Sequence, residues 1–211
     1  MHVSELWRYP VKSLKGEPLE QAEVTLTGIP GDREIAVLSQ EGRLFTSRSR
    51  PRLLALRAEL AADGAVTING FGWESPEAVA LASEAVGQPA KLVRIPQPDA
   101  FDVLPLLIAT DGTVQHLSID RRRLRPNIVI AGVDGLKERD WPGGVIAIGD
   151  VRIRAAKLRE RCVMTTYDPD TQEQDKSVLL RIVRELDGKA ALDCSVIEPG
   201  VVRVGDLVQV I

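Results

Sequence analysis

The sequence predicts a mainly β protein with some α/β character, and three observations support this fold class. Short apolar or alternating runs bounded by Gly, Pro and Asp recur along the 211 residues, as is typical of strands. Few stretches carry helical spacing. Hydrophobic residues make up 44% and charged residues 27% of the chain, which is ordinary globular composition. Many short strands with few helices indicate a β-barrel architecture with some α/β decoration.

The first part of the chain is expected to be rich in short strands. Asp63-Gly64 is typical of a hairpin turn, because such a turn needs positive φ. Ser75 and Pro76 mark the start of a helix as its N-cap and first residue, and Gly87 marks its end. The expected strands are 3–9, 22–26, 34–38, 54–60 and 65–68.

A connection between two halves is expected at 89–105, which carries four prolines and little periodicity. We therefore predict an N-terminal β-rich region at 1–95 and a second domain at 96–211. No internal repeat is visible in either half. The chain is long enough for one large or two small domains that bury most of their apolar surface.

The second half mixes strands with two expected helices. Val178, Ile182 and Leu186 form the stripe of an amphipathic helix over 175–186, and a shorter helix is expected within 110–120. The expected strands are 106–109, 127–131, 145–148, 151–155, 163–167, 194–197, 201–204 and 207–211.

The charge pattern narrows the kinds of partner. A net charge of −3 does not favour a nucleic-acid-binding protein. Two basic stretches, 121–125 and 152–161, nevertheless suit a local anion site. No signal-peptide core is visible, and no run approaches the ~18 apolar residues of a membrane helix. We therefore expect a cytoplasmic protein that binds neither nucleic acid nor a membrane.

Cysteine and histidine are too few for several kinds of metal site. Cys162 and Cys194 alone make no secreted disulfide framework, Cys₄ zinc site or Cys₄ iron–sulfur cluster. With only His2 and His116, a multi-histidine site within one chain is nearly excluded. Each histidine is expected to be an ordinary surface or capping residue.

Cys162 is the candidate with chemistry of its own, although two interpretations stay open. A cysteine at the start of a strand is often a small buried hydrophobe. The charged run 157–161 before it and the polar turn after it instead favour a reactive thiolate. In an extended chain, however, Arg161 would point to the opposite face from Cys162. Cys194 has few cations nearby, and we expect it to have a packing role.

Three further segments carry cations in contexts that suit anion binding. Arg125 stands at the mouth of an expected core strand, where its planar guanidinium could grip a phosphate. Lys12-Ser13 and Gly31-Asp32-Arg33 lie in turn-like contexts. Each segment is weak evidence when it is taken singly.

Taken in order, these segments resemble the MOSC-domain proteins, named for the C-terminal domain of molybdenum cofactor sulfurase. The resemblance includes the N-terminal barrel portion that often precedes this domain, and it covers nearly the whole chain. By motif, the most similar members are the amidoxime-reducing proteins. The matching segments are Tyr9-Pro10-Val11-Lys12-Ser13, Gly31-Asp32-Arg33, Arg125-Pro126-Asn127-Ile128-Val129-Ile130, Trp141, Ile148-Gly149-Asp150-Val151, Arg161-Cys162, Thr165-Thr166, Asp168-Pro169-Asp170-Thr171, Pro199-Gly200 and Val204-Gly205-Asp206.

The resemblance implies a MOSC β-barrel packed against the smaller N-terminal region, with a molybdenum cofactor (molybdopterin-bound molybdenum) between them. It implies that Cys162 is the catalytic cysteine and the protein ligand of the molybdenum. Thr110 matches a further pterin contact of relatives more loosely. The implied cofactor-binding residues are Lys12, Ser13, Arg33, Thr110, Arg125, Asn127 and Arg161.

The implied function is an oxidoreductase that reduces N-hydroxylated or N-oxide small molecules. The chain carries no C-terminal ferredoxin-like domain of the kind found in some bacterial relatives, so a separate electron-donor protein is expected. Two departures concern the rim of the site: Gln172 stands where relatives often have Gly, and an aromatic–Gly pair is absent near Leu192-Asp193. Two alternatives stay open, a carrier of molybdenum cofactor or sulfur without turnover, and a scaffold that binds no cofactor.

Overall fold

The computed structural model describes residues 1–95 and 101–211, and its centre is an eight-stranded sheet. The strand order is β16-β12-β13-β14-β10-β11-β1-β2, with β10 and β11 parallel and the other neighbours antiparallel. The strands are β1 (His2–Arg8), β2 (Glu17–Leu19), β10 (Leu106–Thr110), β11 (Ile128–Ala131), β12 (Val145–Ile148), β13 (Val151–Glu160), β14 (Lys189–Glu198) and β16 (Val208–Val210).

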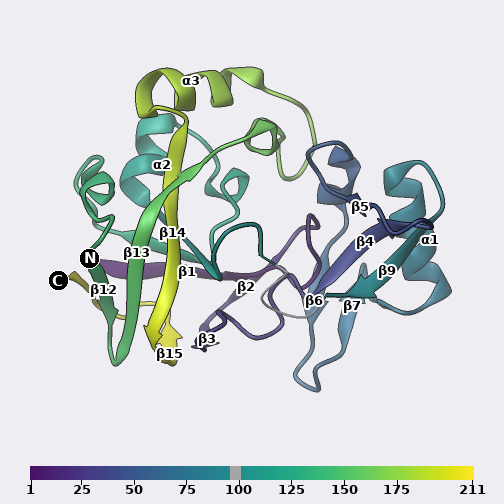
Figure 1. Ribbon diagram of the computed structural model, residues 1–211, viewed down its shortest axis with the longest axis horizontal. Helices are drawn as coiled ribbons and strands as arrows, with labels where there is room; N and C mark the ends of the chain where they lie inside the picture. The colour runs from purple at the N-terminus through teal and green to yellow at the C-terminus, as the bar shows by residue number, and fades with distance from the viewer. Residues whose placement is uncertain (96–100) are drawn as a thin grey trace.

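The ends of this sheet approach each other without forming a closed ladder. A single bridge joins His2 to Leu207, and the amide of Val208 donates to the carbonyl of Met1 over 3.0 Å. The N- and C-termini therefore lie together at one end of the molecule (Figure 1). The mainly β fold class is confirmed, whereas a hydrogen-bonded closed barrel is not seen among the described strands.

The largest hydrophobic core lies against the central sheet and takes residues from both halves of the sequence. Val3 and Leu6 of β1 pack with Ile128 and Ile130 of β11, and all four side chains are fully buried. β3 (Gln21–Val24) pairs with β15 (Gly200–Arg203) on the same side of the molecule. Because β1 and β11 form one ladder, the two halves interlock. The domain boundary at 95/96 itself stays a prediction.

The remaining N-terminal residues build a second, smaller core. The elements that surround this core are two three-stranded sheets, β5-β4-β9 and β6-β7-β8, a 3₁₀ helix at Pro51–Ala55 and one α-helix. Figure 1 shows this part at the opposite end of the molecule from the termini. The elements are β4 (Ile35–Ser39), β5 (Leu44–Phe45), β6 (Ala58–Leu60), β7 (Val66–Ile68), β8 (Phe71–Gly72), α1 (Pro76–Val86) and β9 (Ala90–Arg94).

Local signals explain α1 well. The hydroxyl of Ser75 accepts a hydrogen bond from the amide of Ala78, and Gly87 ends the helix at φ 76°. In the second half, α2 (Asp111–Leu117) and α3 (Lys176–Leu186) form a third hydrophobic cluster beside the central sheet. Across residues 1–95 and 101–211, every helix is too short or too polar to pass through a lipid bilayer.

Three sequence expectations need correction. Residues 163–167 do not form a strand; Val163–Thr166 is a 3₁₀ helix. The hydroxyls of Thr165 and Thr166 donate to the carbonyls of Cys162 and Val163, and such local bonds compete with a sheet ladder. The first two residues of the expected strand 54–60 belong to the 3₁₀ helix that ends at Ala55, and strand β6 begins only at Ala58.

The expected connection at 89–105 contains strand β9, which pairs along the whole of β4. The strand was missed because its residues show no alternation, whereas its ladder with β4 joins segments about 55 residues apart in the sequence. Residues 96–100 of this connection lie outside the described part of the chain.

Candidate functional site

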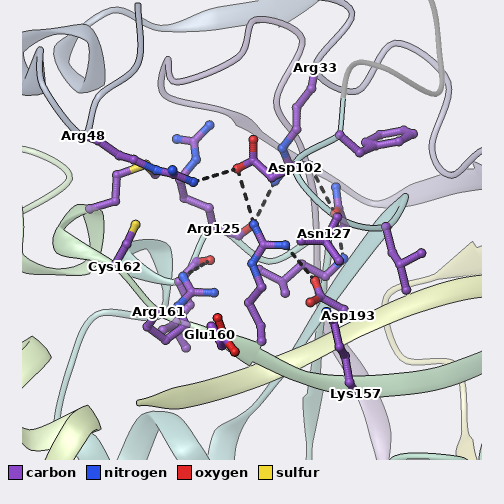
Figure 2. A pocket seen from close by; sticks show the side chains of 17 residues that line it. Arg33, Arg48, Asp102, Arg125, Asn127, Lys157, Glu160, Arg161, Cys162 and Asp193 are labelled. Carbon is purple, nitrogen blue, oxygen red and sulfur yellow. Dashed lines mark hydrogen bonds and ion pairs between the residues drawn. The ribbon is translucent and has the colours of Figure 1, made fainter.

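A cavity of about 350 Å³ opens between the N-terminal part and the central sheet. Six cationic side chains, three carboxylates and one thiol line it, so its lining carries an excess of positive charge beside apolar side chains. Figure 2 shows Cys162 and Arg161 on one side of this cavity and Asp193 and Lys157 on the other. The lining residues are Arg33, Arg48, Phe101, Asp102, Val103, Leu104, Leu107, Leu124, Arg125, Asn127, Lys157, Arg159, Glu160, Arg161, Cys162, Met164 and Asp193.

Cys162 reaches the cavity at the point where strand β13 ends and the 3₁₀ helix begins. The carbonyl of Cys162 accepts hydrogen bonds from the amide of Thr165 (3.1 Å) and its hydroxyl (2.9 Å), which fix the backbone there. The side chain is partly exposed. Arg161 and Cys162 follow the end of β13 and both line the cavity, although Cys162 still has extended backbone (φ −130°, ψ −178°), so the expectation that the two face opposite sides is wrong.

Arg161 is held by the peptide backbone rather than by a carboxylate. Its Nη2 donates to the carbonyl of Leu124 over 2.8 Å, while its Nε is buried with no hydrogen-bond partner in the described part of the chain. Burial lowers the pKa of Arg161 to about 10, which still leaves a cation at neutral pH. A cation with a buried, unused N–H suits a ligand rich in hydrogen-bond acceptors.

Arg33 and Arg125 are organised around the buried ring of Tyr9. The guanidinium carbons of Arg33 and Arg125 lie 4.7 and 4.2 Å from the ring centroid. The hydroxyl of Tyr9 donates to the carbonyl of Pro126 over 3.1 Å, and Nη1 of Arg125 donates to the carbonyl of Leu14 over 2.7 Å. Burial lowers the pKa of Arg125 to about 10 and raises that of Tyr9 to about 12.

The backbone at three candidate residues is strained. Ser13 (φ 72°), Arg33 (59°) and Arg125 (57°) are three of the eight non-glycine residues with positive φ among those described. Residues without a glycine's freedom adopt this conformation only when the surroundings impose it, and such strain clusters at functional sites. All three residues lie at this site: Arg33 and Arg125 line the cavity, and Ser13 lines a smaller space next to it.

Lys12 and Ser13 line a small recess that continues the main cavity. The two spaces share Arg33, Arg48, Asp102, Arg125 and Met164. The Nζ of Lys12 lies 2.7 Å from Oδ1 of Asp102, and the lysine is 8% exposed. The structure therefore brings Lys12, Ser13, Arg33, Arg125, Arg161 and Cys162 to one connected space.

The two remaining candidates differ in position. Asn127 lines the cavity, but its side chain also joins the strands, since Oδ1 accepts from the amide of Leu107 (3.1 Å) and from Arg33 (3.3 Å). Thr110 lies at the far end of β10, where its hydroxyl caps α2 by accepting from the amide of Thr113. Thr110 is fully buried and is not among the described cavity-lining residues, so this arrangement does not support it as a pterin contact.

The basic run 121–125 is mostly committed to structural ion pairs. Arg121 pairs with Glu5, and Arg122 pairs with Asp120 and Asp170. Arg123 pairs with Asp168 and donates to the carbonyl of Thr166 over 2.9 Å, which holds the 3₁₀ helix that follows Cys162. Of the four arginines of this run, Arg125 alone lines the main cavity among the described residues.

Six charged residues of the cavity lining were not among the candidates from the sequence: Arg48, Asp102, Lys157, Arg159, Glu160 and Asp193. Arg48 and Arg159 lie in arginine-rich stretches that are visible in the sequence. The sequence does not show, however, that their side chains point into the cavity. No sequence pattern indicated Asp102 as a site residue, because it lies in the proline-rich connection. Asp193 receives a hydrogen bond from Arg159 across the β13–β14 ladder (3.0 Å), and burial raises its pKa.

The other titratable candidates lie away from the cavity. Cys194 is fully buried in the main core, in agreement with the expected packing role, and burial raises the pKa of its thiol. His116 is exposed and lies 3.0 Å from Glu185. Among the described residues, no group of three His, Cys, Asp or Glu side chains is arranged to hold a metal ion. In the lining of the cavity, Cys162 is the one thiol among the described residues.

Two models of protein domains together match almost the whole chain. The model of the MOSC N-terminal beta barrel domain matches residues 1–98, and the model of the MOSC domain matches residues 107–209. The crystal structure of the YUAD protein from Bacillus subtilis has a TM-score of 0.54 at 15% identity, covering 99% of this chain and 94% of that chain. At that identity the likeness concerns the fold alone.

Two human proteins are similar in sequence. Mitochondrial amidoxime-reducing component 1 is 30% identical, with 99% of this chain and 82% of that protein covered. Mitochondrial amidoxime reducing component 2 is 28% identical, with 82% and 69% covered. Both halves of the chain are thus matched by one family: the chain belongs to the MOSC-domain proteins that carry the N-terminal MOSC barrel domain.

Proposed function

We propose that the cavity binds a molybdenum cofactor through Cys162 and that the protein reduces N-hydroxylated or N-oxide small molecules. The observation that carries this proposal is the meeting of one partly exposed thiol with six cationic side chains in a single cavity. The similarity to proteins named amidoxime-reducing components supports the substrate class.

The residues present fit such a cofactor. A volume of about 350 Å³ is in the range of small-molecule sites, and the excess of cations suits a phosphate-bearing ligand. Two buried guanidinium nitrogens, Nη2 of Arg125 and Nε of Arg161, have no hydrogen-bond partner in the described structure. Buried donors normally have partners, so a ligand rich in acceptors accounts for both.

Each residue has a distinct proposed role. Cys162 would ligate the molybdenum, because a soft thiolate suits a metal already bound by the sulfur atoms of the pterin. Arg161 would stabilise the thiolate as the adjacent cation. Lys12 and Arg125, from the two halves of the chain, would hold the anionic end of the cofactor, and Tyr9 would keep Arg33 and Arg125 in place.

When bound, the cofactor supplies the two-electron redox chemistry, and the protein supplies its position and its electrostatic surroundings. The cations around the cavity disfavour cationic substrates beside the thiol and favour neutral or anionic ones. We also propose that this protein is located in the cytoplasm and that a separate protein donates the electrons.

The test compares the metal and pterin content of the wild type with that of Cys162→Ser, both made in a cofactor-competent host. We expect molybdenum in the wild type and a large loss of metal from the variant. Cys194→Ala is the matched control, because it removes the other thiol, which is buried in the core and does not line the cavity. Equal molybdenum in Cys162→Ser and the wild type contradicts the ligand role, and no metal in either contradicts the proposal.

An activity assay separates an enzyme from a carrier. Metal-loaded protein is supplied with an artificial electron donor and a hydroxylamine-type compound, and the reduced product is measured. We expect turnover that depends on Cys162. Loaded protein without turnover would favour the alternative, a carrier of the cofactor or of sulfur.

A further inference from the structure

Asp102 makes an unusual set of contacts at the mouth of the cavity. Its carboxylate faces cations from three separate segments: Oδ1 lies 2.7 Å from Nζ of Lys12, and Oδ2 lies 3.4 Å from Arg159 and 3.7 Å from Arg48. Figure 2 shows the carboxylate between Arg48 and the centre of the cavity. This half-exposed carboxylate thus forms ion pairs with Lys12 and Arg48 from the N-terminal part and with Arg159 from the central sheet.

These contacts continue into a chain of alternating charge. Arg159 donates to Oδ1 of the buried Asp193 over 3.0 Å and also reaches Asp102, which in turn pairs with Lys12. Since Asp193 is 2% exposed, it anchors the guanidinium of Arg159 from the floor of the cavity. Arg159 is therefore held in position independently of Asp102.

The geometry suits a phosphate better than it suits a carboxylate. A carboxylate has two oxygens, so Oδ2 of Asp102 is shared between Arg48 and Arg159 at the longer distances. A phosphate monoester presents three terminal oxygens, one for each cation, and carries up to twice the charge. Lys12 is nine-tenths buried, and loss of its anionic partner would be costly unless another anion replaced it.

We propose that Lys12, Arg48 and Arg159 form a phosphate subsite that Asp102 occupies as an internal, autoinhibitory ligand until a phosphate-bearing molecule displaces it. This inference deepens the proposed function, on which the identity of the cofactor phosphate as the displacing group rests. Binding is then an exchange of one anion for another, and the loop 101–104 moves away from the three cations when the exchange occurs. Burial alone would raise the pKa of Asp102, but Lys12, Arg159 and Arg48 hold it below its ordinary value, so the internal ligand is an anion at neutral pH.

The first experiment uses inorganic phosphate as the probe and protein made in a host unable to synthesise the cofactor. Calorimetry should show that Asp102→Asn binds phosphate about tenfold more tightly than the wild type, since the competing charge-assisted contact is gone. Glu160→Gln is the matched control, because Glu160 lines the same cavity but pairs with none of the three cations in the described structure. We expect it to change affinity by about twofold or less. Equal phosphate affinity in Asp102→Asn and the wild type, or an equal gain in Glu160→Gln, overturns the proposal.

A thermal-shift measurement gives a second reading on the same proteins. Without phosphate, Asp102→Asn should melt below the wild type, because Lys12 has lost a counter-ion. Added phosphate should raise the melting temperature of the variant more than that of the wild type. A larger phosphate effect in the wild type would contradict the exchange.

Cofactor-loaded protein distinguishes the two sources of phosphate. If the cofactor phosphate occupies the subsite, the loaded wild type should no longer bind inorganic phosphate. If the loaded protein binds it as the unloaded protein does, the exchange serves a free phosphate. Molybdenum content is measured alongside, so failure of the subsite with full metal loading leaves the proposed function intact.

Discussion

The guanidinium of Arg125 lies over the ring of Tyr9, with 4.2 Å between Cζ and the ring centroid. The two residues are far apart in the sequence and come from the two halves of the chain. The contact joins the turn after β1 to the turn before β11, and Arg33 approaches the same ring at 4.7 Å. Tyr9 therefore places two of the cavity's cations without lining the cavity itself.

Replacing Tyr9 by Leu should destabilise the protein and loosen both arginines. We expect the free energy of unfolding to fall by about 3 kcal/mol, from lost packing and two cation–π contacts. Tyr9→Phe keeps the ring and should lose only about 1 kcal/mol, for the bond to the carbonyl of Pro126. Urea titrations measure both, and equal losses would show that the ring contacts contribute nothing.

Gly16 is expected to tolerate no side chain. A Cβ there would lie 2.5 Å from the carbonyl oxygen of Arg8 and 2.5 Å from a ring carbon of Tyr9. Gly16→Ala should therefore shift the ring and cost about 2 kcal/mol of stability. Gly72→Ala is the control, since nothing lies within 4 Å of its Cβ position. A variant Gly16→Ala as stable as Gly72→Ala would contradict the close approach.

The two thiols should differ sharply in reactivity. Cys162 is partly exposed at the cavity, whereas Cys194 is fully buried and its pKa is raised by burial. Iodoacetamide should modify Cys162 in the folded, cofactor-free protein and Cys194 only after unfolding. Peptide mass spectrometry after short exposure reads out each site. Modification of Cys194 at the same rate in folded protein would refute its burial.

Asp170 should contribute stability that depends on pH. Hydrogen bonds from Arg122 and Lys15, each 2.7 Å long, hold the pKa of its carboxyl well below the ordinary value. Because the folded pKa is depressed, the contribution is present above the unfolded pKa of about 4 and is lost as the pH falls below it.

Asp170→Asn should thus lower the free energy of unfolding at neutral pH by roughly 1 kcal/mol or less, and by a smaller amount at about pH 3. Asp134→Asn serves as the control, because it removes an exposed carboxylate paired with Lys137 on the surface. Denaturant titrations at the two pH values test this. A loss that grows on acidification would reverse the expected sign.

Elements with local signals could be predicted from the sequence, and elements defined by distant pairing could not. The bounds of α1 follow from Ser75, Pro76 and Gly87, and the hairpin of β6 and β7 follows from Asp63-Gly64. Strand β9 was missed because only its ladder with β4 makes it a strand. The 3₁₀ helix after Cys162 was mistaken for a strand because its threonine hydroxyls bind backbone carbonyls nearby.

The sequence by itself determined the residue types of the site: a cysteine next to an arginine, and cations within short motifs around Lys12, Arg33 and Arg125. Only the tertiary structure decided that these residues share one cavity, that Thr110 caps a helix instead, and that Asp102 faces three cations there. The physical reason is that charges act through space, over a few ångströms, between segments that the fold alone brings together.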